Sequence, residues 1–111
     1  MGAGQAPWGV PLSQVHVGLH DGFAGDEVIV VVNGQEVYHN DDVKTRTQIS
    51  RADELVVTVE EKSTTVNVTL PRRGISKDFQ LDSSEPVWLG VSVTSDDRLE
   101  GRVTQTPFRY L

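Results

Sequence analysis

The strongest pattern along the chain is a run of five β-branched residues at positions 28–32, followed directly by Asn33-Gly34 and then by the segment 35–38. β-Branched side chains are stiff about χ1 and fit the pleated backbone of a strand better than a helix. Asn-Gly is the dipeptide that most readily adopts the positive φ angles of a type I′ turn. The pattern therefore predicts a β-hairpin with its tight turn at residues 33 and 34.

Apolar and polar side chains alternate with a period of two in most of the other segments, which is typical of half-buried strands. The alternation is clearest at 87–94, and Asn and Asp at 39–42 indicate a turn. No segment has a sustained period of 3.6 residues, so crossover helices are not expected. About seven or eight short strands with frequent turns are typical of an all-β antiparallel sandwich of immunoglobulin-like or jelly-roll type. The further predicted strands are 15–19, 44–49, 55–60, 64–70 and 99–103, and 75–81 is an additional candidate in which Lys77 breaks the alternation.

The chain is predicted to form one domain. Residues 1–12 contain three of the ten glycines and two of the five prolines, and we expect an irregular N-terminal arm there. The single sandwich domain then occupies residues 13–111, ending in an irregular C-terminal tail from residue 104. A chain of 111 residues is long enough to bury a core without staples, and it contains no cysteine.

The loops of an antiparallel sandwich alternate between its two ends if each strand reverses the one before it. One predicted end collects the loops 21–27, 40–43, 60–63 and 82–85, which are rich in Asp and Glu. The other predicted end collects 33–34, 50–54, 71–74 and 95–98, where Arg and acidic residues are mixed. We therefore expect the charge to be polarised along the strands.

An acidic end invites a calcium site, because calcium takes six to eight oxygen ligands and Asp-rich loops can supply them. The predicted ligands are Asp21, Asp26, Asp41 and Asp42. The alternative is that Asp and Asn are common in loops because they stabilise turns. No calcium loop of fixed spacing is present, so the sequence implies no resident cofactor.

The histidines suggest a second metal hypothesis. His16 and His20 are four residues apart on one strand, about 13 Å in an extended backbone, which is too far for one ion to contact both. His20, His39 and Asp41 flank the same predicted end and form the candidate site. The alternative is that these are ordinary, partly exposed histidines.

Aromatic and apolar side chains on outward faces indicate a partner surface. Trp88 lies on the face opposite Val87 and Leu89, and it and Tyr38 are candidate stacking platforms for a sugar or a peptide. The alternative is that a terminal segment covers Trp88, and the candidate covers are Trp8 with Pro11, or Phe108 with Tyr110. Ile29 and Val31 are outward if the rest of their strand faces the core. A strand that is apolar on both faces needs cover on both, from a terminal segment or from another protein.

Charge and motifs narrow the function classes. The net charge of −6 argues against binding to nucleic acid, and no apolar run is long enough to insert into a membrane. The first residues lack the features of a signal peptide, and nothing else in the sequence indicates a compartment. No serine lies in a nucleophile elbow, so no catalytic residue is assigned and an enzyme is not expected.

The sequence thus predicts a non-catalytic protein-interaction or assembly module, with a protein partner or self-association. The alternative is a carbohydrate-binding module that uses an exposed aromatic platform, with calcium as an optional ligand.

Overall fold

The computed structural model describes residues 12–46, 48 and 51–108. This part of the chain forms eight strands in two four-stranded sheets, and the protein is all-β. A 3₁₀ turn, η1 (Pro71–Arg73), follows β5. The strands are β1 (Ser13–Leu19), β2 (Ala24–Val32), β3 (Gln35–Lys44), β4 (Asp53–Val59), β5 (Ser63–Leu70), β6 (Ile75–Asp82), β7 (Val87–Val93) and β8 (Leu99–Thr104).

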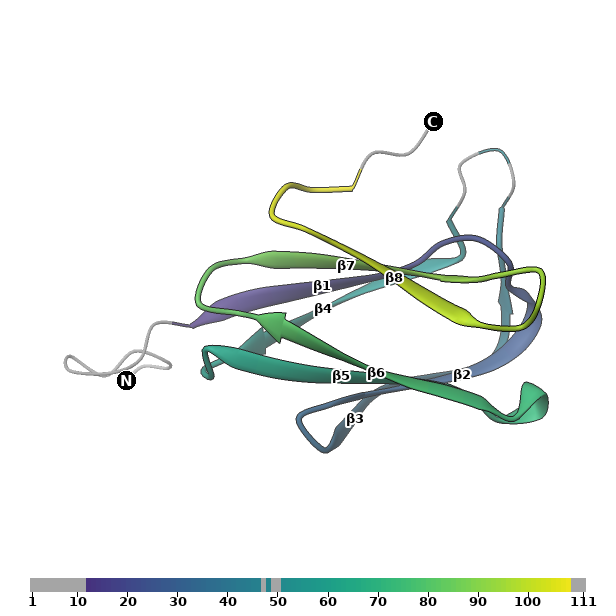
Figure 1. Ribbon diagram of the computed structural model, residues 1–111, viewed down its shortest axis with the longest axis horizontal. Helices are drawn as coiled ribbons and strands as arrows, with labels where there is room; N and C mark the ends of the chain where they lie inside the picture. The colour runs from purple at the N-terminus through teal and green to yellow at the C-terminus, as the bar shows by residue number, and fades with distance from the viewer. Residues whose placement is uncertain (1–11, 47, 49–50, 109–111) are drawn as a thin grey trace.

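The two sheets lie one above the other in Figure 1. The first has the order β4-β1-β7-β8 and is called the β1 sheet; it is mixed, because β1 and β7 run parallel. The second has the order β3-β2-β5-β6, is antiparallel throughout and is called the β2 sheet. Neither sheet is closed, and the arrangement is consistent with a β-sandwich.

One hydrophobic cluster joins the inner faces of both sheets. The predicted alternation holds in β1, β5 and β7, where every second side chain is buried. Burying one Val or Leu side chain contributes about 1.5–3 kcal/mol before the entropy of ordering is subtracted. The fully buried side chains include Val15, Val17, Leu19, Val28, Val30, Val66, Val68, Leu70, Val87, Leu89 and Val91.

The predicted hairpin is confirmed. Asn33 and Gly34 have φ angles of 49° and 83°, as a type I′ turn requires, and they connect β2 to β3. The Asn33 side chain also accepts a hydrogen bond from the backbone NH of Thr65 at 2.9 Å, which ties the turn to β5.

The turn predicted at 39–42 is wrong, because β3 continues through these residues to Lys44. β3 is an edge strand, and among the described strands it pairs with β2 alone. Its Asn and Asp side chains are exposed, so they keep their hydration in the strand. Asn40 still makes the local contact expected of it, accepting a hydrogen bond from the Asp42 NH at 2.9 Å.

The strand predicted at 44–49 is also wrong in the part that the structure describes. Lys44 ends β3, and beyond it Arg46 forms only an isolated bridge with Arg51. Thr47 and Ile49 of that predicted strand lie outside the described residues, as does nearly all of the predicted N-terminal arm.

Because the predicted strand at 44–49 is not formed, every loop after β3 lies at the end of the molecule opposite to the predicted one. The loop between β1 and β2 now lies with η1 and the turn at 94–98, because Arg73 donates hydrogen bonds to the Gly22 carbonyl and to Asp97. The acidic loop at 60–62 lies at the hairpin end, where the Asn33 amide donates to Glu61 at 3.2 Å. The prediction that these acidic loops gather at one end is therefore wrong.

None of the described residues belongs to a helix long and apolar enough to span a membrane.

Candidate functional site

The outer face of the β1 sheet carries a row of apolar and aromatic side chains. The strand register places His16 of β1 beside Val56 of β4 on one side and beside Trp88 of β7 on the other. The rings of His16 and Trp88 are stacked, with centroids 4.5 Å apart and planes at 11°. Val56 is 51% exposed although it is a large hydrophobic residue. We call Val56, His16 and Trp88 the aromatic row.

Next to the aromatic row, two glycines lie side by side, Gly18 of β1 and Gly90 of β7. A Cβ atom built on Gly90 would lie 2.6 Å from the His20 ring, and one on Gly18 would lie 2.8 Å from the Phe108 ring. The absence of side chains at these positions therefore makes room for His20 and Phe108, whose rings meet edge to face at 4.7 Å. Burial beneath these neighbours lowers the pKa of His20.

The position of Phe108 shows where the C-terminal tail goes. After β8 the chain turns back above the β1 sheet, as Figure 1 shows for the yellow segment. The sequence suggested Phe108 as a cover for Trp88, but the structure places it over Gly18 and His20 instead. The stacked partner of Trp88 is His16.

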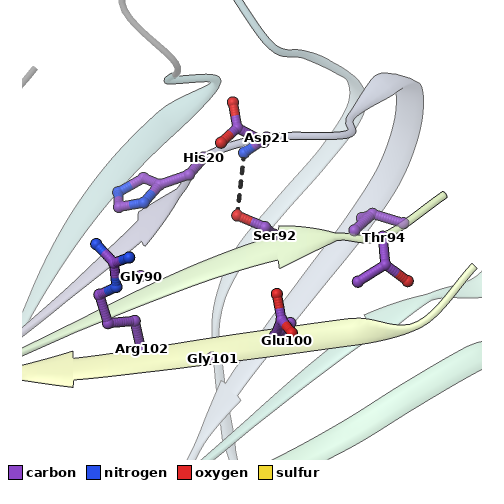
Figure 2. Close-up of a pocket in the computed structure, with 9 residues that line it drawn as sticks. His20, Asp21, Gly90, Ser92, Thr94, Glu100, Gly101 and Arg102 are labelled. Carbon is purple, nitrogen blue, oxygen red and sulfur yellow. Dashed lines mark hydrogen bonds between the residues drawn. The ribbon is translucent and has the colours of Figure 1, made fainter. Parts of the chain in front are cut away.

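A groove of about 630 Å³ continues from His20 along β7 and β8. Figure 2 shows His20 and Asp21 on one side of it and Arg102 and Glu100, from β8, on the other. Ser92 lies between them and accepts a hydrogen bond from the Asp21 NH at 3.2 Å. The groove thus offers carboxylate, guanidinium, imidazole and hydroxyl groups within one open concavity on the same face as the aromatic row.

Tyr38, a predicted stacking platform, has another role in the structure. Its ring packs against the core, and its hydroxyl donates a hydrogen bond of 2.6 Å to Asp53 of β4. Burial and the neighbouring Asp53 carboxylate raise the Tyr38 pKa well above its usual value. Tyr38 therefore links the edges of the two sheets.

Ile29 and Val31 lie on the outer face of the β2 sheet and are half-buried. The cross-strand neighbours of Ile29 are His39 and Thr69, and Val31 has Asn67 beside it. Both predicted partner-surface residues are thus flanked by polar side chains of β3 and β5. They are also on the side of the fold opposite to the aromatic row.

The four predicted calcium ligands do not form one cluster. Both carboxylate oxygens of Asp26 accept hydrogen bonds from Arg73, at 2.7 and 2.8 Å, and this contact lowers the Asp26 pKa. Asp21 lines the groove on the β1 sheet, whereas Asp41 and Asp42 lie on β3 of the other sheet. A guanidinium therefore occupies the place at Asp26 where a cation was expected.

A different set of potential metal ligands comes together on the β2 sheet. The Nε2 atom of His39 lies 2.8 Å from a Glu27 carboxylate oxygen and 3.3 Å from one of Asp41. The sequence hypothesis paired His39 and Asp41 with His20, but His20 packs against the β1 sheet. Glu27 was missed because β3 was expected to end before His39, although Glu27 shares the outward phase of Ile29 and Val31.

The sequence matches no protein-family model, and no curated protein is significantly similar to it.

Proposed function

We propose that this domain is a non-catalytic interaction or assembly module that binds a protein partner, or a second copy of itself, on the outer face of the β1 sheet. The observation that carries the proposal is the aromatic row. A sheet in a two-layer fold needs only one apolar face, and the inner face already supplies it. An additional outward patch of Trp, His and exposed Val is typical of a contact surface, where Trp is enriched among the residues that dominate binding.

The packing of the aromatic row favours a protein over a sugar as the ligand. A pyranose ring stacks on an open aromatic face, but one face of the Trp88 indole is already covered by His16 at 4.5 Å. The second predicted platform, Tyr38, is held by Asp53 and the core. A protein surface needs no free ring face, because it can contact the indole edge and the exposed Val56 together.

The groove beside His20 supports carbohydrate binding as the second candidate function. Its volume of about 630 Å³ lies within the ~300–1,000 Å³ range of small-molecule sites. Asp21, Glu100 and Arg102 offer charged donors and acceptors that suit a ligand rich in hydroxyl groups. In this proposal the sugar binds along β7 and β8, and Trp88 contacts its end.

We further propose that the two sheets form a sandwich of the general kind found in immunoglobulin-like and jelly-roll domains. What supports this is the pair of four-stranded sheets around one core and the crossovers that join non-sequential strands, such as β2 with β5. The likeness is architectural, because an immunoglobulin domain pairs its first two strands within one sheet, whereas β1 and β2 lie in different sheets here.

The test uses two equally exposed valines on opposite edges of the β1 sheet. Val56 of β4 is 51% exposed and belongs to the aromatic row, whereas Val103 of β8 is 52% exposed and does not. Sedimentation velocity across a concentration range measures self-association of the wild type, Val56→Asp and Val103→Asp. We expect association that Val56→Asp abolishes and Val103→Asp retains.

If the wild type is monomeric, photo-crosslinking from position 58, which neighbours the row on β4, identifies a partner by mass spectrometry. The same comparison of Val56→Asp with Val103→Asp then applies to the cross-linked product. Equal loss in both variants, or in neither, contradicts the proposed surface. Retardation of the wild type in a polysaccharide affinity gel, lost in Arg102→Ala but kept in Val56→Asp, favours the carbohydrate alternative instead.

A further inference from the structure

The strongest unassigned cluster of ligand-type side chains lies on the outer face of the β2 sheet. Glu27 comes from β2, and His39 and Asp41 come from the adjacent edge strand β3. One donor atom from each of the three side chains lies within 4.8 Å of the other two. This cluster is independent of the proposed partner surface, which is on the other sheet.

An irregularity in strand pairing brings these three side chains together. The register between β2 and β3 shifts at Glu27, so that β3 places two residues, Asp41 and Asp42, opposite one residue of β2. The extra residue lets Val43 return to the core, where it is 2% exposed. The outward positions before it, His39 and Asp41, then both lie beside Glu27.

The exposure of the three side chains suits a site that is partly formed before a ligand arrives. The Glu27 side chain is 23% exposed and that of His39 is 42% exposed, while that of Asp41 is 75% exposed. Donor atoms bound to one tetrahedral ion at about 2.0–2.2 Å lie roughly 3.4 Å from one another. The two His39 distances, 2.8 and 3.3 Å, are slightly shorter than this value, and all three donor atoms lie within 4.8 Å of one another. Small movements of these side chains, mainly of the exposed Asp41 carboxylate, are therefore enough to complete the set.

The donor set indicates which class of ion fits. Calcium and magnesium take oxygen ligands, whereas an imidazole nitrogen with carboxylates suits zinc and neighbouring transition metals. Three protein ligands leave a fourth tetrahedral position open. Lys44 is paired with Asp42 at 3.7 Å rather than with the cluster, so its ammonium group is not the counter-ion of Asp41.

We propose that Glu27, His39 and Asp41 form a three-ligand binding site for a divalent transition-metal ion of the zinc class. The ion binds His39 Nε2 and one carboxylate oxygen each from Glu27 and Asp41. The ring binds the ion as a neutral imidazole with its proton on Nδ1. An imidazolium therefore releases its Nε2 proton to the solvent, whereas a neutral ring protonated on Nε2 first changes tautomer by exchange with water, with no net release of a proton. The fourth position is open to water or to a side chain of another molecule.

The test titrates the metal-free protein with Zn²⁺ alone, near pH 7.5, by isothermal calorimetry and by NMR of the histidine ring nitrogens. We expect one equivalent of Zn²⁺ to bind and to shift the Nε2 resonance of His39. Removing a direct ligand in His39→Ala or Glu27→Gln should weaken binding by more than the ~10- to 100-fold typical of second-shell changes. The Tm of the wild type should rise with Zn²⁺, and that of His39→Ala should not.

Asp41→Asn and Asp42→Asn form the matched pair, because they remove the same charge from neighbouring positions of β3. Only Asp41→Asn should weaken Zn²⁺ binding. Equal weakening in both variants would mean a diffuse attraction to acidic side chains and would overturn the proposal. It is also overturned if His39→Ala binds Zn²⁺ as the wild type does, if Ca²⁺ binds as tightly as Zn²⁺, or if no binding occurs at millimolar Zn²⁺.

Discussion

Arg73 donates four side-chain hydrogen bonds at the η1 end of the molecule. Its guanidinium donates two hydrogen bonds to Asp26, one to Asp97 at 2.8 Å and one to the Gly22 carbonyl at 3.1 Å. The Asp26 side chain is 9% exposed, so the pair is largely removed from water. Arg73 thereby holds η1, the start of β2 and the turn before β8 together.

The substitution Arg73→Met keeps most of the side-chain volume and removes all four hydrogen bonds. Breaking a fully buried ion pair costs about 3–5 kcal/mol, because the remaining charge is left without its partner. An exposed pair is worth only about 0–1 kcal/mol. Since the Arg73 side chain is 23% exposed, we expect an intermediate loss of about 2–3 kcal/mol. In a domain of this size that corresponds to a fall in Tm of roughly 10 °C.

Urea denaturation of wild type and variants measures the loss, and Arg72→Met is the matched control. Arg72 belongs to the same turn and donates one exposed hydrogen bond, to the Gly25 carbonyl at 3.1 Å. Its substitution should cost less than about 1 kcal/mol. If Arg73→Met costs no more than Arg72→Met, the Asp26 pair is not a principal support of this end.

The pH dependence gives an independent check of the same contact. Arg73 lowers the pKa of Asp26 in the folded protein, so the stabilisation is present above the unfolded pKa of about 3.9. It is lost as the pH falls through the lower, folded-state pKa. In Arg73→Met this part of the acid-induced loss should disappear. An unchanged slope of stability against pH below about pH 4 would refute the assignment.

Three further predictions concern other parts of the fold. Gly22 and Gly34 have similar φ angles, +88° and +83°, but of the two only Gly22 has a backbone oxygen close to the position of an added Cβ, at 2.0 Å. In urea denaturation Gly22→Ala should therefore lower the free energy of unfolding by at least about 2 kcal/mol more than Gly34→Ala. Equal losses would show that backbone strain alone decides both. Tyr38→Phe removes the hydrogen bond between the sheet edges and should cost about 1 kcal/mol, and an unchanged midpoint in urea would contradict that role. NMR titration should show that the His20 pKa lies below its usual value of about 6.5 and rises towards that value in Phe108→Ala. The unfolded chain binds this proton more readily, so the free energy of unfolding should fall as the pH drops from about 6.5 towards the lowered pKa.

Local patterns in the sequence predicted most of the elements correctly. The β-branched run followed by Asn33-Gly34 specifies a hairpin through two local preferences. β-Branched side chains favour an extended backbone, and Asn-Gly readily adopts the positive φ angles of the turn. The alternation at 87–94 likewise predicted β7 and the outward position of Trp88, since one face of the strand has to be buried. Both signals are local, and neither depends on which strands become neighbours.

The ends of β3 could not be predicted from local chemistry. Local chemistry favours a turn at Asn40, Asp41 and Asp42, because Asn and Asp side chains bond to the nearby backbone. An edge strand also accepts these residues, since their side chains stay exposed there and its backbone pairs on one side only. Pairing with the long strand β2 outweighed the turn preference. This single error moved all later loops to the opposite end, and with them Arg73, which was predicted to lie far from Asp26.

The candidate sites depend on contacts between distant segments, which explains why the sequence located them only in part. His16 and Trp88 are stacked because β1 pairs with β7 in parallel, a pairing that residue alternation does not specify. The alternation of polar and apolar residues assigns no role to Gly18 or Gly90. Their role becomes clear only when His20 and Phe108 occupy the space above them.

The edge strand β3 connects the packing of the core with the candidate metal site. A register without the extra residue would place Asp42 opposite Asp26 and turn Val43 towards the solvent, since a shift of one position exchanges the faces of a strand. The observed register buries Val43 and leaves His39 and Asp41 on the outer face beside Glu27. Burial of one valine favours this register by about 1.5–3 kcal/mol, so the hydrophobic core holds the three ligand side chains together before any ion binds.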